Sequence, residues 1–130
     1  MILLDTNTLI HYLKGRDSVV SRLQATPPTE LGIPSVVAYE VGYGTRKSGS
    51  ARRQSVISGL LANISIVAFD LDAAQEAARI RVELEAHSWS IGPMDLLIAG
   101  TAVSRSAVLV TCNTKEFSRI RGLRLEDWTS

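Results

Sequence analysis

The chain has almost no cysteine and no long apolar run. Cys112 is the single cysteine among 130 residues, so an internal disulfide is impossible. This favours a reducing compartment and predicts a cytoplasmic protein. No stretch approaches the roughly 20 apolar residues that cross a bilayer, and the N-terminus lacks the basic start and apolar core of a secretory signal. We therefore expect neither a disulfide-rich secreted domain nor a membrane-spanning chain.

Histidine is scarce, and the net charge is close to zero. His11 and His87 are the only histidines, and neither has the spacing of a zinc motif. The formal net charge of +1 gives no sign of a polyanionic partner. Two local basic clusters are each compatible with a solvated surface as well as with a phosphate-binding patch. The first contains Arg46, Lys47, Arg52 and Arg53, and the second contains Lys115, Arg119, Arg121 and Arg124.

What is present is the composition of an ordinary globular protein, with 45% apolar and 21% charged residues. Short apolar runs at residues 2–4, 31–33, 64–69 and 107–110 predict buried strands, with a further extended piece at 123–125. Helical patterns separate these runs. The alternation predicts an α/β fold in one domain over residues 1–130, with a short parallel sheet of four to five strands and helices on both faces.

Several helix starts are visible in the sequence. Pro34-Ser35 is expected to open a helix that reaches about residue 48, and Gly92-Pro93 one that reaches residue 104. Asp72 is expected to begin another helix, with Gln75 three residues later in a capping-box arrangement. Residues 115–117 are expected to form a short helical turn.

Asp5 stands where the first predicted strand ends. Ligands of parallel α/β sheets bind at the carboxyl ends of the strands, so Asp5 is a candidate for a functional site. The alternative is a structural role as the N-cap of the following helix. Thr6 or Asn7 could fill that role equally well.

Glu40 and Asp95 lie on apolar helix faces. Glu40 is three or four positions from Val36, Val37, Tyr43 and Gly44, which predicts an inward direction. An unpaired carboxylate there is costly; an ion pair with Lys47 is the alternative to metal binding. Asp95 heads the apolar stripe of Ile98, Ala99, Ala102 and Val103. Compensation of the helix dipole is the alternative reading for Asp95.

Three carboxylates that converge from a strand end and two helix faces predict a divalent metal site, because a cation offsets their mutual repulsion. Oxygen ligands favour Mg²⁺ or Mn²⁺ over Zn²⁺. Asn113 follows the fourth predicted strand and is either a further ligand or a turn residue. We expect supporting hydrogen bonds to the acids, or to waters around the ion, from Thr6, Asn7, Thr111 and Thr114.

Several segments resemble one known family. The opening residues 1–7 (MILLDTN) resemble the start of PIN domains, and residues 91–99 (IGPMDLLIA) resemble their third-acid motif. Residues 34–40 (PSVVAYE) are similar to the helix start that carries the second acid. Residues 109–117 (LVTCNTKEF) and 122–128 (GLRLEDW) resemble the C-terminal signature of VapC toxins of bacterial type II toxin–antitoxin systems. The resemblance covers essentially the whole chain.

The resemblance implies a function. Asp5, Glu40 and Asp95 would be the metal-binding acids, and Asn113 stands where the family often has a fourth acid. Glu116 lies nearby and is assigned no role. Such proteins cut RNA, often tRNA, form homodimers and are blocked by a VapB-like antitoxin, through which alone they engage DNA.

The sequence thus predicts metal-assisted hydrolysis of an RNA phosphodiester, with single-stranded loops as targets. The first basic cluster is expected to hold the RNA backbone. The alternative from another class is a non-cleaving PIN-like module that binds RNA or a protein partner. A haloacid-dehalogenase-like phosphatase would need a second Asp where Asn7 stands, and a dinucleotide-binding dehydrogenase would need a Gly-rich loop after the first strand.

Overall fold

A computed structural model describes all 130 residues of the chain. Its centre is a five-stranded sheet with the strand order β3-β2-β1-β4-β5, in which every neighbouring pair is parallel. The predicted parallel α/β sheet is therefore confirmed. The strands are β1 (Ile2–Leu4), β2 (Leu31–Pro34), β3 (Ser65–Val67), β4 (Val108–Val110) and β5 (Arg124–Glu126).

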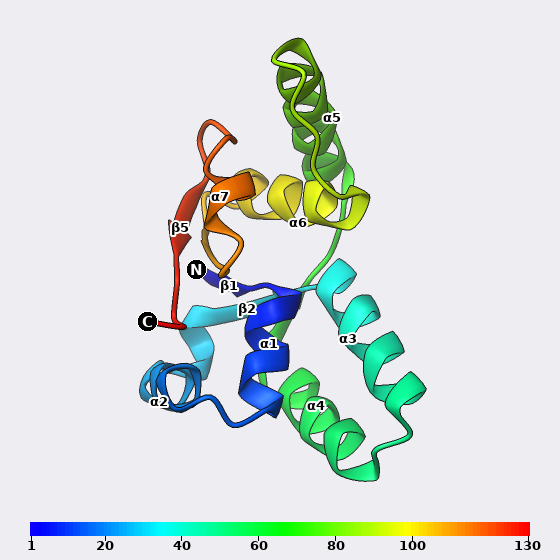
Figure 1. Ribbon diagram of the computed structural model, residues 1–130, viewed down its shortest axis with the longest axis vertical. Coiled ribbons are helices and arrows are strands. Elements are labelled where there is room, and N and C mark those ends of the chain that lie inside the picture. Colours follow the sequence, from blue (N-terminus) through cyan, green and yellow to red (C-terminus); the bar gives the residue numbers. More distant parts are fainter.

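Helices connect all the strands. The first two connections carry α1 (Thr6–Leu13), α2 (Asp17–Ala25), α3 (Ser35–Ser48) and α4 (Ala51–Asn63), with a short 3₁₀ turn at Pro28–Glu30. The last two carry α5 (Leu71–Ala86), α6 (Pro93–Ser104) and α7 (Thr114–Phe117). The chain moves outward from β1 to β3, then crosses back over β1 to β4. Right-handed crossovers in opposite directions place α1–α4 on one face and α5–α7 on the other, as Figure 1 shows.

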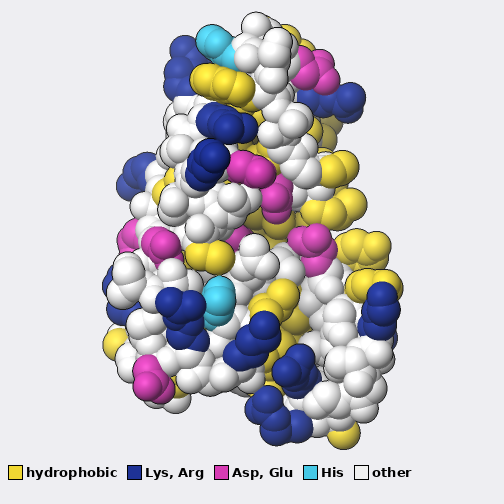
Figure 2. Space-filling model, viewed as in Figure 1, with side chains coloured by type: hydrophobic (Ala, Val, Ile, Leu, Met, Phe, Trp, Pro, Cys, Tyr) yellow, Lys and Arg dark blue, Asp and Glu magenta, His cyan; other side chains and the backbone are white.

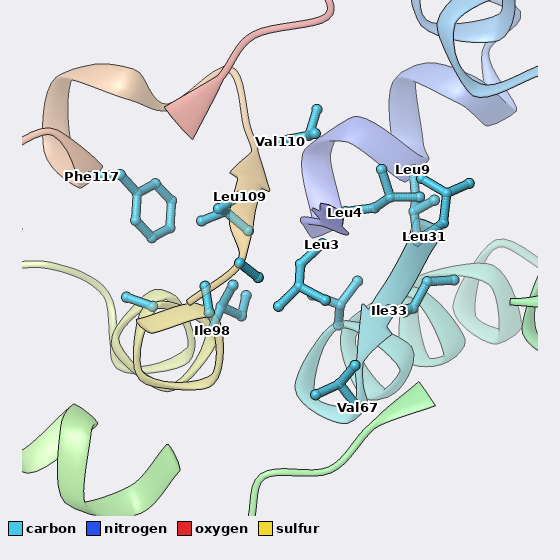
Figure 3. Close-up of a cluster of buried hydrophobic side chains, with 14 of the residues drawn as sticks. Leu3, Leu4, Leu9, Leu31, Ile33, Val67, Ile98, Leu109, Val110 and Phe117 are labelled. Carbon is cyan, nitrogen blue, oxygen red and sulfur yellow. The ribbon is translucent and has the colours of Figure 1, made fainter. Parts of the chain in front are cut away.

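The core lies on both sides of the short central strands. Leu3, Leu4 and Leu109 are fully buried between the helical layers, and Figure 3 shows them pointing among side chains from β2, α6 and α7. The central strands β1 and β4 have only three residues each. Because helices cover both faces of the sheet, the side chains on both faces of these strands are apolar and contribute to the core.

Gly100 sets the distance between α5 and α6. A Cβ atom added at Gly100 would lie 2.6 Å from the carbonyl oxygen of Ala73 and 2.7 Å from the Cβ of Ala77. The two helix backbones therefore approach each other so closely that only glycine fits at this crossing. Because α6 also carries Asp95 in its first turn, this contact sets the position of the helix that bears Asp95 relative to α5.

Two local expectations were wrong. The helix expected from Asp72 begins one residue earlier, and its cap is Asp70, whose Oδ1 accepts a hydrogen bond from the Ala73 N–H at 3.0 Å. The capping box of Asp72 and Gln75 is therefore not used. The strand expected over residues 64–69 is limited to Ser65–Val67, because the parallel register extends only from Gly32 to Pro34 of β2.

The lengths and compositions of the helices indicate whether any of them could cross a membrane. None of them combines the length and the apolar character that a bilayer-crossing segment needs. α5, the longest at 16 residues, carries ion pairs along its surface, including Arg79 with Glu76 and Glu83.

Candidate active site

The site lies at the carboxyl ends of the three central strands. Asp5 follows β1, Thr111 follows β4, and α3 begins directly after β2. The connections leave β1 in opposite directions on its two sides. Such a switch point opens a crevice at the strand ends, which is where parallel α/β sheets bind their ligands. The sheet topology alone therefore brings Asp5 next to the segment after β4.

Asp5 is both a helix cap and a buried acid. Its side chain is almost inaccessible, with 3% of the residue exposed, and its Oδ1 accepts a hydrogen bond from the Thr8 N–H at 2.9 Å. Burial raises the pKa of Asp5, the negative charge of Glu40 adds to the rise, and hydrogen bonds from Thr111 and Thr8 oppose it. Capping and ligand binding, which the sequence offered as alternatives, are compatible because capping engages only one carboxylate oxygen.

Glu40 is held by a hydroxyl group. The Thr6 Oγ1 donates a hydrogen bond to the Glu40 Oε1 at 2.6 Å, so the start of α1 orients a carboxylate from the middle of α3. The expected support from Thr6 is thus seen. No ion pair involves Glu40, and the Lys47 ammonium group lies instead over the Tyr43 ring, 5.6 Å from its centroid.

The inward stripe expected around Glu40 is only partly present. Val37 is fully buried, whereas Tyr43 is 58% exposed and Gly44 is exposed. Glu40 therefore lies at the boundary between the core and solvent. A carboxylate at such a boundary faces the strand ends and remains accessible to a ligand.

The pKa of Asp95 reflects the presence of the other acids. It occupies the first turn of α6 and heads the buried stripe that includes Ile98, Ala99 and Ala102. Burial and then the negative charges of Asp5, Glu40 and Glu116 raise the pKa of Asp95 to about 6. Because the charges of three other acids contribute to this shift, Asp95 lies within electrostatic reach of each of them.

Asn113 and Thr111 organise the segment after β4. The backbone N–H of Asn113 donates to the Thr111 Oγ1 at 3.0 Å, and its side-chain Nδ2 donates to the Glu116 Oε2 at 3.3 Å. The amide oxygen of Asn113 has no hydrogen-bond partner, and Glu116 is a fourth acid near the site. Sequence reasoning gave Glu116 no role; its position in the first turn after Asn113 was the available signal.

The other expected supporting residues differ in their surroundings. Thr111 is fully buried and lowers the pKa of Asp5 through its side chain. Asn7 and Thr114 are exposed, and neither side chain hydrogen-bonds an acid. Supporting roles for these two would require an intervening water.

The donor set fits a hard divalent cation. No three His, Cys, Asp or Glu side chains already surround one point at ligand distance. Burial, and after it the negative charges of neighbouring acids, nonetheless raises the pKa values of Asp5 and Asp95. A cation removes that repulsion, and an all-oxygen set with one amide suits Mg²⁺ or Mn²⁺. Glu116 and the Asn113 amide would complete such a set.

Basic residues border this acidic centre. A hollow of about 260 Å³ is lined by Glu40 together with Arg53 and Lys14. Lys14, which directly follows α1, was missed by sequence reasoning because it stands apart from the basic cluster. Arg46 and Arg52 donate to backbone carbonyls of Gly42 and Leu13. Figure 2 shows Asp and Glu side chains near the middle of this face, with Lys and Arg groups on either side.

Comparison with known proteins decides the family. The model of the PIN domain family matches residues 2–123. The chain belongs to the PIN domain family. This excludes the phosphatase and dehydrogenase alternatives, and it confirms the resemblance on which the acids were assigned.

Relatives of this PIN domain are ribonucleases by name. The chain is 38% identical over 128 residues to the tRNA(fMet)-specific endonuclease VapC of Shigella flexneri. The match covers 98% of this chain and 97% of the relative. The chain is 36% identical to Ribonuclease VapC2 of Rickettsia felis, covering 97% and 96% of the two chains.

Solved structures show the same fold. A chain in the crystal structure of VapBC2 from Rickettsia felis, bound to a DNA fragment from its promoter, superposes with a TM-score of 0.90 at 36% identity and covers 98% of this chain and 99% of that one. A chain in DNA-bound VapBC from Salmonella typhimurium gives a TM-score of 0.87 at 36% identity, covering 98% and 97%. The PIN architecture therefore extends over nearly the whole chain.

Proposed function

We propose that this PIN domain is a VapC-type toxin that cleaves RNA internally, with tRNA as its substrate class. The observation that carries the proposal is the position of the acids: Asp5 follows β1, and the neighbouring Thr6 donates a 2.6 Å hydrogen bond to Glu40. The charges of Asp5 and Glu40, after burial, also raise the pKa of Asp95. A cluster of mutually repelling acids at a strand-end crevice is unfavourable unless a ligand uses it. The named activities of the relatives supply the reaction and the tRNA class.

VapC nucleases of the PIN family generally depend on a divalent metal, and Mg²⁺ or Mn²⁺ is the ion we propose here. Asp5, Glu40 and Asp95 would hold it, with Asn113 as a further oxygen donor. Held by these residues, such an ion would supply charge compensation at the scissile phosphate and a stronger water nucleophile at neutral pH. This chemistry requires no side-chain nucleophile.

The chain's own groups orient the reacting partners. Thr6 fixes Glu40 through its 2.6 Å hydrogen bond, and the Thr8 N–H fixes Asp5. Arg53 and Lys14 line the hollow beside Glu40 and carry no carboxylate partner. They are therefore free to pair with the phosphates that flank the scissile bond. Arg46, Lys47 and Arg52 lie further along α3 and α4 and would hold the more distant backbone.

The partners follow from the same relatives. Several structural neighbours are toxin–antitoxin complexes, two of them DNA-bound. We propose a VapB-like antitoxin as the partner that blocks the acidic centre, and contact with DNA only through that antitoxin. We also propose a homodimer, and the cytoplasm as the place where the toxin meets tRNA.

The test is direct. Brief expression followed by sequencing of cellular RNA ends should reveal new ends at one or a few tRNA positions with the parent protein. They should be absent with Asp95→Asn, while Asp17→Asn, an exposed acid at the start of α2, should cut like the parent. Identical RNA ends with and without the parent would instead favour the non-cleaving binding module.

A further inference from the structure

The C-terminal end of α5 presents two stacked rings. The backbone at Ser88 has a φ of 57°, and the N–H groups of Ser88 and Trp89 donate to the carbonyls of Glu85 and Leu84 at 3.0 and 2.9 Å. This pair of bonds is a Schellman motif, in which the left-handed residue reverses the chain. As a result, the rings of His87 and Trp89 stack with their centroids 4.5 Å apart and an interplanar angle of 19°.

An arginine from a distant segment completes the arrangement. The Arg119 guanidinium lies 5.7 Å from the centroid of the Trp89 ring, although 30 positions separate the two residues in the sequence. Arg121 forms an ion pair with Glu83 at 2.9 Å, whereas Arg119 forms none. Its positive charge therefore remains available to an anion.

The stack borders an open hollow. About 360 Å³ of space is lined by His87, Trp89, Arg119 and Arg121 together with part of α5. Trp89 remains 40% exposed although His87 and Arg119 both lie against its ring. In Figure 2 a histidine, hydrophobic side chains and basic groups lie side by side at the end of the molecule to which α5 extends in Figure 1.

The chain segment that contains α7 links Asn113 of the acidic centre to Arg119 of the hollow. Arg119 is six residues after Asn113, so their Cα atoms are at most about 20 Å apart. Between them lies Lys115, which is exposed and also has no carboxylate partner. A single strand of nucleic acid that crosses the acids can therefore follow Lys115 and place a base beside Trp89.

We propose that Trp89, His87 and Arg119 form a stacking platform for an unpaired base of the RNA substrate, a few nucleotides from the cleaved bond. The proposal rests on the proposed ribonuclease function. Its chemistry is that of single-strand recognition, in which bases stack on aromatic rings and guanidinium planes while basic groups contact the backbone. The platform gives a role to Arg119 and Lys115 of the second basic cluster, which the acidic centre does not use.

The experiment measures RNA binding without cleavage. A short fluorescently labelled single-stranded oligoribonucleotide is titrated with the full chain in EDTA. Trp89→Ala should weaken binding roughly 5- to 150-fold, the range found for loss of one base–aromatic stack, and Trp89→Phe should retain most of the affinity. Arg119→Ala should also weaken binding, and Arg22→Ala is its matched control, since it removes a guanidinium above the other tryptophan, 5.3 Å from the Trp128 ring.

Intrinsic fluorescence gives a second readout. The chain has two tryptophans, and Trp128 is buried, so quenching by the oligoribonucleotide should report on Trp89 and should persist in Trp128→Phe. With metal present, Arg119→Ala should raise KM for a long RNA while kcat stays unchanged, as for loss of uniform binding.

The possible outcomes distinguish a failure of the stacking platform from a failure of the proposed ribonuclease function. Equal binding by the parent and Trp89→Ala, or no quenching by RNA, would overturn the platform. So would a dissociation of the homodimer by Trp89→Ala that accounts for all the lost affinity, since Trp89 would then belong to a contact between copies. Failure of the parent to cut any RNA would refute the proposed function, while the EDTA titration would still decide the platform.

Discussion

The hydroxyl of Thr6 donates to the carboxylate of Glu40 at 2.6 Å, across 34 positions of sequence. Thr6 directly follows Asp5, so one short segment at the end of β1 supplies an acid and also orients a second acid from α3. The two carboxylates are therefore positioned together, and neither can turn away without breaking a hydrogen bond.

This relationship predicts the effect of removing the hydroxyl. Thr6→Val keeps the side-chain shape but leaves Glu40 without its donor. We expect roughly a 10- to 100-fold loss of Mn²⁺ affinity or of RNA cleavage, the usual cost of losing a group that orients a ligand. Thr6→Ser should retain most of both. Calorimetric titration with Mn²⁺ and a cleavage assay would measure the effect. The control is Thr26→Val, which removes a hydroxyl that donates to the Arg22 carbonyl just after α2.

The amide of Asn113 offers a second test. Its Nδ2 donates to Glu116, which directs the amide oxygen away from that acid. Asn113→Asp adds a negative charge at this point and should raise the affinity for Mn²⁺ several-fold, because Coulomb attraction to a divalent ion grows with ligand charge. Asn7→Asp adds the same charge at an exposed residue of α1 and should have a smaller effect. Unchanged Mn²⁺ affinity in Asn113→Asp would remove Asn113 from the ligand set.

Gly100 should be intolerant of any side chain. A Cβ there would lie 2.6 Å from the Ala73 carbonyl oxygen and 2.8 Å from the Ala77 backbone nitrogen, and backbone atoms of packed helices cannot easily move. We expect Gly100→Ala to lower the free energy of unfolding by about 1–3 kcal/mol. Gly59→Ala, at a helical position with open space around it, should instead raise it by up to about 1 kcal/mol. Urea unfolding of both variants would show whether the α5–α6 contact is as close as described.

The cap of α5 predicts a pH dependence of stability. Hydrogen bonds from the Ala73 N–H and then from Arg105 hold the pKa of Asp70 below its ordinary value of 3.8. Because the folded-state pKa is the lower one, this stabilisation is present above the unfolded-state pKa and is lost as the pH falls through the folded-state pKa. Asp70→Asn keeps a capping oxygen but loses the charge. Its deficit in unfolding free energy should therefore be full near neutral pH and should vanish in acid.

A matched variant isolates this effect. Asp72→Asn removes the same charge from the first turn of α5, where no ion pair is formed. Unfolding by denaturant across pH 3–7 would compare the two variants with the parent. A deficit of Asp70→Asn that stays constant over this range would contradict the ion pair with Arg105.

Much of the site was predictable because its residues contradict their local surroundings. Asp5 ends an apolar strand and Asp95 heads an apolar helix stripe, so both acids stand out in the one-dimensional pattern. Glu40 was found for a partly wrong reason, since Tyr43 on the expected inward face is exposed. Lys14 and the stack of His87 on Trp89 were not found, because nothing in their immediate sequence indicates what they approach.

The sequence by itself determined the alternation of strands and helices and the family, and it singled out the candidate acids, since each depends on residue type and short-range spacing. Only the tertiary structure decided how the acids are oriented and which basic side chains border them. It also decided that His87, Trp89 and Arg119 meet beyond the end of α5. The reason is physical: the Thr6–Glu40 bond, the charge coupling at Asp95 and the Arg119–Trp89 contact all join segments that are distant along the chain. Their geometry is set by the order of five parallel strands and by the close crossing of two helices at Gly100.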